Sequence, residues 1–362
     1  MTIRSGISRT LGAAANFLLV SVPTVALCLL AVEVPLRMAG YGQLEIYEPH
    51  PNMFWRLKPN QNGLTKVDRK PFHINSHGTR GPDFLSEKPA GTLRIVSLGD
   101  SRTFGWGLSD QETYSAVLES LLQKRLGGGR RVEVINAGVN AWSLSQMYAY
   151  FRHEGVTYTP DYVVIGDGNA WTQFREDADP TFVRRFMWSV RLKNLLRRFA
   201  VYHYVIEVKL ENVYQRYREK FIPLDPQNDT LYKEQQQRDP DRLFRDEIEH
   251  LCRLALDEGV TPVLLYLPTQ KELGEKPSGV YLAKAAIARE LNIPLVDLTP
   301  LLKDRNDPLY LDADTVHLNV AGNRLIADAL AGAIAPLIAN TNATSTVASR
   351  TASTGVRQEG LR

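Results

Sequence analysis

The hydrophobic pattern of the chain begins with an uncharged apolar run and then alternates short apolar strands with amphipathic helices. The expected strands are Leu93–Leu98, Val132–Asn136, Tyr162–Ile165, Pro262–Leu267 and Ile293–Leu298. Helical periodicity follows them at Tyr114–Leu126, Ser143–Glu154, Asp241–Glu258, Val280–Leu291 and Val320–Ala335. This alternation predicts an α/β fold, with a five-stranded parallel sheet covered by helices on both faces.

The first apolar run, from Leu11 to Val32, is long enough as a helix to cross a bilayer. Arg4 and Arg9 precede it, so the positive-inside rule places residues 1–10 in the cytoplasm and the rest of the chain in the periplasm. We therefore expect a single-pass inner-membrane protein with one transmembrane helix. A cleaved signal peptide is the first alternative, although the run is long and has no convincing cleavage site. A buried soluble helix is the second, and it would need partners on all its faces.

The remaining chain divides by composition into four parts. A juxtamembrane segment, 33–91, is rich in Pro, Asn and Gly and has short strand-like pieces. The α/β domain covers 92–339, and a long insertion at 170–240 interrupts the crossover between the third and fourth strands. Pro336 disturbs the end of the last helix. The Thr-, Ser- and Ala-rich tail, 340–362, is predicted to be disordered.

Charge and cysteine content exclude several classes of function. A formal charge of +3 over 362 residues gives no argument for nucleic acid as a partner. The two cysteines, Cys28 in the apolar run and Cys252 in an expected helix, suit neither a disulfide nor a zinc site. His73 and His77 have the spacing of a metal pair on a helix, but Asn75 and Gly78 favour a turn there. We expect no metal and no cofactor.

Residues that could take part in catalysis follow the expected strands. Ser101 ends Gly99-Asp100-Ser101 after the first strand, Gly138 follows the second, and Asn169 follows the third. Each has an ordinary explanation, since turns favour Gly, Ser and Asn and a loop Asn often caps a helix. Asp314 and His317 lie three residues apart in the loop before the last helix. Their ordinary explanation is that Asp314 caps a helix and His317 lies on the surface. Because reactive groups collect at the carboxyl ends of parallel strands, the fold can bring all of them together.

Together these blocks resemble the SGNH hydrolase superfamily, also called GDSL esterases, over about 94–330 without the insertion. The resemblance implies a flavodoxin-like α/β/α fold with Ser101 as nucleophile, His317 as base and Asp314 orienting the base. It also implies an oxyanion hole formed by Ser101, Gly138 and Asn169. The third block, which is the segment around Asn169, departs from the family pattern. Asn169 matches only after a shift of one residue, and no Asp follows it.

Two stretches upstream resemble a membrane-anchored bacterial subgroup of that family. They are Glu33-Val34-Pro35-Leu36-Arg37 and Ile74-Asn75-Ser76-His77-Gly78-Thr79-Arg80-Gly81. A further departure is Arg102, where the family pattern has an apolar or aromatic residue. Arg102 is expected either to bind a negatively charged substrate group or to pair with a nearby carboxylate.

The insertion carries a basic stretch with no acidic residue between Asp179 and Glu207. One interpretation is a lid or arm that touches anionic lipid headgroups or an anionic polymer. The other is a solvated amphipathic helix packed over the domain. Nucleic acid is a poor third, given the expected compartment.

The function expected from the whole sequence is a serine esterase acting on ester-linked acyl groups of small molecules or cell-envelope saccharides. An O-acyltransferase for envelope polysaccharide would use the same three residues, so the sequence leaves it open. A non-catalytic domain that binds envelope polymers is a third possibility, favoured by the departures in the third block. The sequence names no protein partner.

Overall fold

The computed structural model describes residues 17–44, 46–65, 68–167, 180–210, 240–274, 276–303, 305, 307–312 and 314–355. Its centre is a five-stranded sheet of β5 (Thr92–Gly99), β6 (Arg131–Gly138), β7 (Tyr162–Ile165), β8 (Thr261–Tyr266) and β9 (Leu295–Asp297). All neighbouring strands are parallel, in the order β6-β5-β7-β8-β9. This is the flavodoxin-like order, and the predicted fold class is confirmed.

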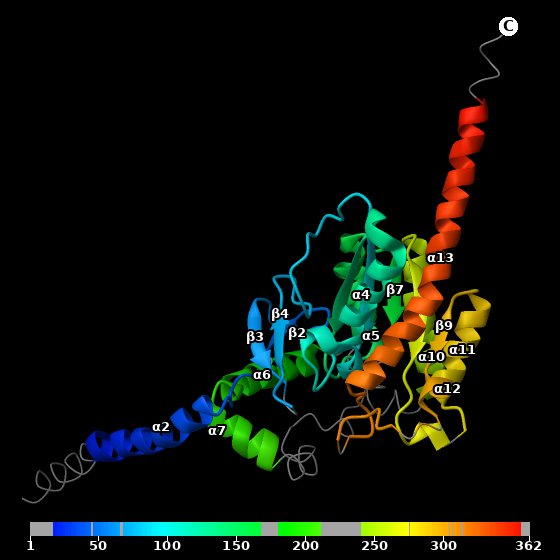
Figure 1. The fold of residues 1–362 in the computed structure, drawn as a ribbon. Helices are drawn as coiled ribbons and strands as arrows, with labels where there is room; N and C mark the ends of the chain where they lie inside the picture. The colour runs from blue at the N-terminus through cyan, green and yellow to red at the C-terminus, as the bar shows by residue number, and fades with distance from the viewer. Residues whose placement is uncertain are drawn as a thin grey trace, which may run out of the picture.

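Two helical layers cover the sheet, one on each face. Successive strand residues point to opposite faces, so each strand contributes buried side chains to both layers. Val96 and Leu98 of β5 belong to one buried cluster, and Leu93 and Ile95 belong to the other. The first cluster includes side chains of α5 (Leu144–His153), α10 (Pro240–Asp257) and α11 (Gly279–Glu290). The second includes side chains of α4 (Tyr114–Leu126) and α13 (Val320–Gly355). The domain is thus the three-layer α/β/α sandwich that the sequence predicted (Figure 1).

The segment between the N-terminal helix and the sheet is part of the first cluster. It forms two antiparallel hairpins, β1 (Tyr47–His50) with β2 (Phe54–Leu57), and β3 (Gln61–Leu64) with β4 (Pro71–Ile74). Met53, Leu57 and Ile74 are fully buried there. The stretch that the sequence marked only as juxtamembrane therefore packs on the α/β domain.

Short helices complete the described elements. They are α3 (Ser101–Phe104), η2 (Asp110–Glu112), η3 (Gly127–Gly129), η4 (Gly155–Tyr158), η7 (Glu272–Gly274) and α12 (Thr299–Leu302). The described part of the insertion is helical, as α6 (Pro180–Arg197), α7 (Ala200–Tyr202) and η5 (His203–Lys209).

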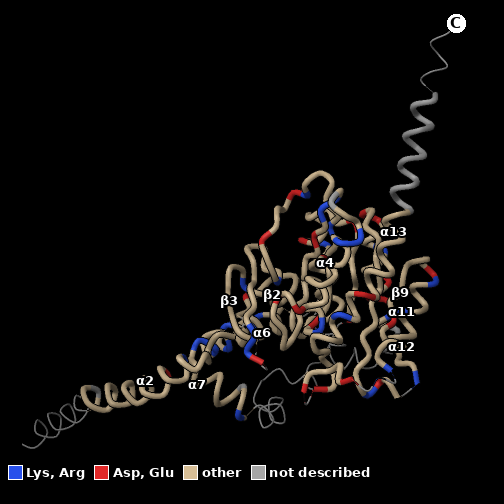
Figure 2. The backbone as a smooth tube through the Cα atoms, viewed as in Figure 1, with Lys and Arg blue, Asp and Glu red and all other residues tan. Residues whose placement is uncertain are grey.

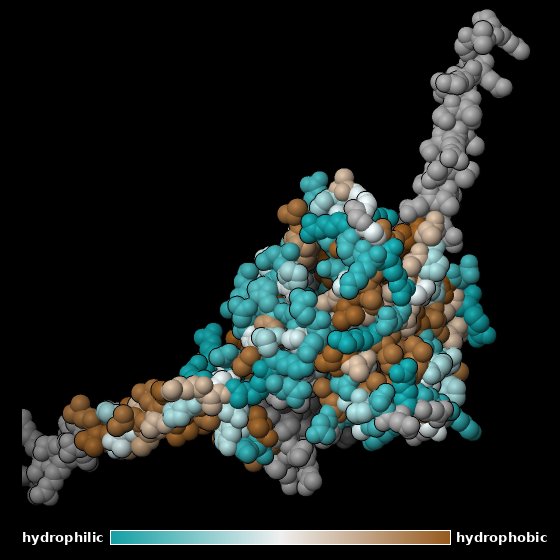
Figure 3. Space-filling view, viewed as in Figure 1, coloured by the Kyte–Doolittle hydropathy of each residue, from teal (hydrophilic) through white to brown (hydrophobic). Residues whose placement is uncertain are grey.

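The N-terminal helix, η1 (Phe17–Ser21) continued by α2 (Val22–Met38), projects away from the domain (Figure 1). Leu19–Met38 is a candidate membrane span by length and composition, and none of it is buried. Figure 3 shows its apolar surface uncovered. The uncharged run ends at Val32, and the helix continues beyond it to Met38, with an ion pair between Glu33 and Arg37 one turn apart, at 2.7 Å.

The last helix also differs from the sequence expectation. Its backbone continues from Val320 through Pro336 to Gly355, and so includes residues 340–355 of the tail predicted to be disordered. Apart from Pro336, the sequence contains no helix-breaking residue between Gly332 and Gly355, so an established helix can propagate. Val320–Ala339 passes the same length and composition test as the N-terminal helix, but 44% of it is buried and it packs on the sheet.

Candidate active site

The turn after β5 presents Ser101 at the carboxyl edge of the sheet. Asp100 caps α3, since its side chain accepts a hydrogen bond from the Arg102 N–H at 2.9 Å. A Cβ added to Gly99 would lie 1.9 Å from Thr103 Oγ1, so only glycine permits this tight approach of strand and helix. Ser101 is therefore held at the first residue of α3 by its neighbours on both sides.

Ser101, His317 and Asp314 form a continuous hydrogen-bonded chain. Ser101 Oγ lies 2.7 Å from His317 Nε2, although the two residues are 216 positions apart. His317 Nδ1 lies 2.7 Å from Asp314 Oδ2. Asp314 Oδ1 also accepts the backbone N–H groups of Val316 and His317, at 2.7 and 3.0 Å. The carboxylate thus holds one imidazole nitrogen and leaves the other facing the serine.

Trp106 is a component of the site that the sequence did not single out. Its ring stacks on the His317 imidazole with centroids 5.7 Å apart and an interplanar angle of 28°. The Trp106 N–H donates to the Ser101 carbonyl at 3.0 Å, which places the indole next to the nucleophile turn. The sequence gave no signal for it beyond its position five residues after Ser101.

Asp314 is charged at working pH. Burial raises the pKa of its carboxyl, but the hydrogen bonds and charge of His317 outweigh burial and lower the pKa to about 2. A carboxyl whose pKa is depressed in the folded state stabilises the protein above its unfolded pKa, and this contribution is lost as pH falls through the folded pKa. The window for Asp314 therefore runs from about pH 4 down to about pH 2.

We expect Asp314→Asn to remove part of the acid-induced loss of stability. The free energy of unfolding of the wild type should fall between about pH 4 and pH 2, and that of the variant should fall less over the same range. Urea denaturation at a series of pH values measures both slopes. Asp312→Asn, an exposed neighbour, is the control and should keep the wild-type slope. Equal slopes for all three proteins would contradict the assignment.

Gly138, predicted as an oxyanion donor, makes contacts of a different kind. Its N–H donates to Asn136 Oδ1 at 3.0 Å. A Cβ at this position would lie 2.2 Å from Phe104 N, so the glycine allows β6 to pack against α3. The Gly138 N–H is thus already used within the strand, and its oxyanion role stays a prediction. Asn169, the third predicted donor, lies outside the described residues.

The loop after Gly138 contains a second residue that sequence reasoning missed. Ala141 has φ 65°, a left-handed conformation that alanine rarely adopts. Within the described part of the chain, the N–H groups of Ala141 and Ser101 have no hydrogen-bond acceptor. Backbone strain of this type often marks functional loops.

Arg102 lies in an ion-pair network with two buried carboxylates. Its guanidinium contacts Asp100 Oδ2 at 2.9 Å and Asp167 Oδ2 at 3.3 Å. Burial alone would lower the pKa of Arg102, but the two carboxylates raise it above its ordinary value. Of the two roles expected for Arg102, pairing with nearby carboxylates is the one that its contacts satisfy.

The same network continues to Lys284, which is fully buried on α11. Its ammonium group pairs with Asp167 Oδ1 and donates to the Leu265 carbonyl. Burial lowers the pKa of Lys284, and the charge of Asp167 partly offsets this effect. Asp167 Oδ2 also accepts the Leu267 N–H at 2.8 Å. The end of β7 is thereby tied to β8 and to the nucleophile turn.

Lys284→Met should destabilise the protein by about 3–5 kcal/mol, because it removes a cation from a buried carboxylate. Chemical denaturation of the two proteins gives the difference. Arg289→Met on the exposed side of the same helix is the matched control, and about 0.5 kcal/mol or less is expected for it. A Lys284→Met variant as stable as this control would show that the pair contributes little.

Arg80 explains part of the upstream motif. Its guanidinium donates to the carbonyls of Phe104 and Gly105 at 2.7 and 2.8 Å, and to Asp110 Oδ1 at 2.7 Å. The motif thus supports the helix that begins at Ser101. The two histidines of the region do not share a helix, because His73 is on β4 and His77 lies in the next turn, where its Nε2 contacts the Phe84 carbonyl at 2.9 Å.

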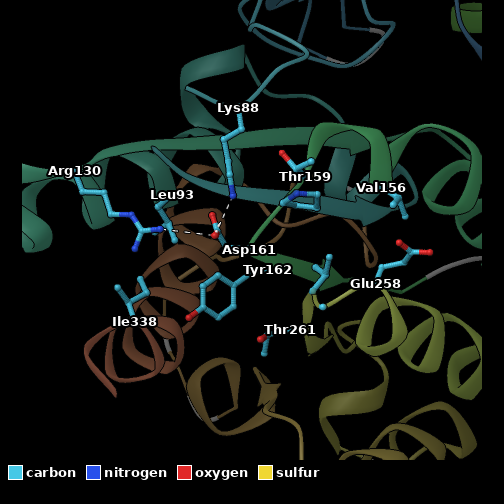
Figure 4. A pocket seen from close by; sticks show the side chains of 13 residues that line it. Lys88, Leu93, Arg130, Val156, Thr159, Asp161, Tyr162, Glu258, Thr261 and Ile338 are labelled. Carbon is cyan, nitrogen blue, oxygen red and sulfur yellow. Dashed lines mark hydrogen bonds and ion pairs between the residues drawn. The ribbon is translucent and has the colours of Figure 1, made fainter. Parts of the chain in front are cut away.

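A cavity of about 450 Å³, lined by both polar and apolar side chains, lies at the opposite edge of the sheet (Figure 4). Leu93, Tyr162 and Thr261, at the starts of three strands, line it. Lys88 and Arg130 extend toward Asp161 across it, at 3.1 and 3.7 Å. Ser101 follows the other end of β5, so this cavity is not part of the candidate active site.

Comparison with known proteins shows the family to which the chain belongs. A model of the GDSL-like lipase/acylhydrolase family matches residues 97–325. No curated protein matches the chain.

Solved structures that resemble the chain include three esterases or acylhydrolases. The esterase EstA from Pseudoalteromonas sp. is 14% identical, with 68% of this chain and 98% of that chain covered and a TM-score of 0.41. The lipase/acylhydrolase from Enterococcus faecalis is 17% identical, with 66% and 93% covered and a TM-score of 0.39. A variant of the acetyl-xylooligosaccharide esterase Axe2 from Geobacillus is 18% identical, with 67% and 94% covered and a TM-score of 0.41. At these values the likeness carries no conclusion about substrate.

Proposed function

Because this chain belongs to the GDSL-like lipase/acylhydrolase family and is a hydrolase acting on ester bonds, we propose that Ser101 is its nucleophile, His317 its general base and Asp314 the residue that orients the base. The unbroken chain of hydrogen bonds from Ser101 Oγ through the imidazole to the Asp314 carboxylate carries this proposal. A serine hydroxyl is a weak nucleophile by itself, and an adjacent base activates it.

In the proposed reaction, Ser101 Oγ attacks the ester carbonyl carbon while His317 Nε2 takes the hydroxyl proton. The tetrahedral intermediate collapses when the imidazolium gives this proton to the leaving alcohol, and an acyl-serine remains. Water then attacks the acyl-serine while His317 takes its proton, and the imidazolium gives this proton to Ser101 Oγ as the carboxylic acid leaves. Asp314 stabilises the imidazolium in both half-reactions.

We assign the oxyanion contacts to the backbone of the nucleophile turn and of the loop after β6. The N–H groups of Ser101 and Ala141 support this assignment, since neither has an acceptor among the described residues. Asn169 remains a proposed third donor. One such donor contributes about 3–4 kcal/mol to transition-state stabilisation.

We further propose that the alcohol part of the substrate is a saccharide of the cell envelope. Trp106 supports this, because a partly exposed aromatic ring beside the base offers a rigid, flat surface for a sugar ring. Arg102 does not add a requirement for an anionic group, since its guanidinium is paired with carboxylates.

The α2 helix is proposed to anchor the domain in the inner membrane, with the active site on the periplasmic side. Its uncovered apolar surface supports a membrane span, and the arginines before it support this orientation. Carbonate extraction of membranes that contain the full chain tests the anchor. Retention in the pellet is expected, and release of an intact chain would contradict it.

The test of function is hydrolysis by the full chain in detergent, in water enriched in ¹⁸O. p-Nitrophenyl acetate and an acetylated xylo-oligosaccharide are the two substrates, and each released acetate should carry one ¹⁸O atom. Unlabelled turnover that requires an added sugar acceptor would instead indicate the acyltransferase. A folded protein that cleaves neither ester would contradict the proposal. Cleavage of the nitrophenyl ester alone would contradict only the proposed saccharide substrate.

A further inference from the structure

The end of α2 is joined to the insertion by specific contacts. The Glu33 carboxylate accepts the N–H groups of Ala200 and Val201, at 2.8 and 3.1 Å, in the first turn of α7. Arg37 donates to the Arg198 carbonyl. The proposed membrane span and the insertion therefore form one structural unit at the point where the span ends.

Contacts just beyond α2 strengthen this junction. The Gly42 N–H donates to His203 Nδ1 at 2.9 Å, and a Cβ on Gly42 would lie 3.1 Å from the Ala200 Cα. The Tyr41 ring packs edge-on against the rings of His203 and Tyr204, with centroids 5.2 and 5.1 Å apart. Tyrosines are enriched at the level where helices leave a bilayer, because their rings are apolar and their hydroxyls are polar.

The segment held at this junction exposes apolar side chains. Val205, Val208 and Leu210 at η5 are 37–40% exposed, and Phe199 before α7 is 48% exposed. Elsewhere in the insertion, Phe186 of α6 packs on Trp55 with ring centroids 5.1 Å apart, while Trp188 on the same helix is 64% exposed. The side chains of η5 named above are thus exposed apolar surface beside the end of the proposed span.

Cations surround the same junction. Arg69 stacks on the Tyr41 ring at 4.8 Å and donates to the Ala39 carbonyl, and Lys209 lies over the Tyr204 ring at 5.4 Å. A third cation, Arg198, is exposed just before α7. Figure 2 shows the positive charge gathered where the insertion meets α2. Of the acidic groups at the junction, Glu33 is already paired, Asp68 is exposed, and Glu207 is part of η5 itself.

We propose that α7–η5, together with Phe199, lies in the headgroup layer of the bilayer from which α2 emerges, and that Arg69, Arg198 and Lys209 around the junction select anionic lipid. This inference rests on the proposed anchoring by α2. Exposed apolar side chains next to tyrosines and cations are the composition of a segment that binds at a membrane surface. The contact would fix the catalytic domain close to the membrane, so the insertion would act as a second attachment.

Site-directed spin labelling of the full chain in lipid nanodiscs tests this. Native Cys28 is exposed on α2 and reports on the span, while Cys252 is buried and is not expected to react. Val208→Cys in a Cys28→Ala background reports on η5. Leu85→Cys in the same background is the control, because Leu85 is exposed on a loop of the α/β domain. Circular dichroism of each labelled protein verifies that it is folded.

Collision with oxygen and with an aqueous nickel reagent gives the depth of each label. In nanodiscs of phosphatidylcholine with phosphatidylglycerol, the Val208→Cys label should lie about 5–10 Å into the headgroup and acyl boundary, while the Leu85→Cys label stays aqueous. In phosphatidylcholine alone, the Val208→Cys label should shift toward water.

The outcomes separate the inference from the anchor on which it depends. A deep Cys28 label with an aqueous Val208→Cys label would overturn the headgroup contact and leave the anchor intact. A Cys28 label that is aqueous in a folded protein would overturn both. Equal depth in the two lipid compositions would overturn the selection of anionic lipid.

Discussion

Replacing Ser101 by alanine is expected to lower kcat for p-nitrophenyl acetate by about 10⁴- to 10⁶-fold, with little change in the free energy of unfolding. The reason is chemical, because Ser101 Oγ is the atom that His317 Nε2 contacts at 2.7 Å. The lost hydroxyl makes few other contacts, so the fold should tolerate its removal. Steady-state kinetics and urea denaturation of the same preparation measure the two quantities.

Ser86→Ala is the matched control for this substitution. Ser86 is exposed on the loop before β5, and only its carbonyl takes part in a described hydrogen bond, with Arg94. Its replacement should leave kcat at the wild-type value. A Ser101→Ala variant that keeps more than about one tenth of the wild-type kcat would remove this serine from the mechanism, since each factor of ten corresponds to only about 1.4 kcal/mol.

His317→Ala should cause a loss of similar size, about 10⁴- to 10⁶-fold in kcat, because a serine without its base is a poor nucleophile. His250→Ala is the control, as His250 is exposed on α10. Kinetics with the same nitrophenyl ester measure both variants. Activity of His317→Ala close to that of the control would show that another group takes the proton.

The two substitutions should not be additive. Residues that act as one unit lose their joint contribution when either is removed, so Ser101→Ala with His317→Ala should be no slower than Ser101→Ala alone. A further loss of more than about tenfold in the double variant would mean that His317 acts independently of Ser101, against the hydrogen bond between them.

Strands and most helices could be predicted from the sequence because they depend on local periodicity. The runs at Leu93–Leu98 and Tyr162–Ile165 are mostly apolar and are buried on both faces, as in a parallel sheet between helices. Ser101, Asp314 and His317 were identifiable because each lies in a loop after a strand or before the last helix. Their roles came from resemblance to a family, and the structure supplies the distances.

Long-range pairing could not be predicted. Asp167 and Lys284 are 117 positions apart, and no local pattern indicates that one buried charge neutralises the other. Gly138 illustrates a related limit, because a glycine after a strand suits both an oxyanion contact and close packing against α3. Ala141 carried no signal, since alanine gives no indication of a left-handed backbone.

The ends of the first and last helices depend on tertiary contacts as well as on local sequence. The uncharged run ends before Glu33, and the helix continues past it, where Glu33 pairs with Arg37 and accepts the Ala200 N–H. Pro336 suggested an end to the last helix, but a proline removes one hydrogen bond, and the buried turns before it hold the helix on the sheet.

Covalent labelling with a fluorophosphonate tests the central claim most directly, because the reagent reacts with a serine that is activated by its base. The full-length wild type in detergent should be labelled, and mass spectrometry of the digest should place the adduct on Ser101. Ser101→Ala should not be labelled, and His317→Ala should be labelled far more slowly. A folded wild type that does not react, or an adduct on a different serine, would contradict the assignment of Ser101 as the nucleophile.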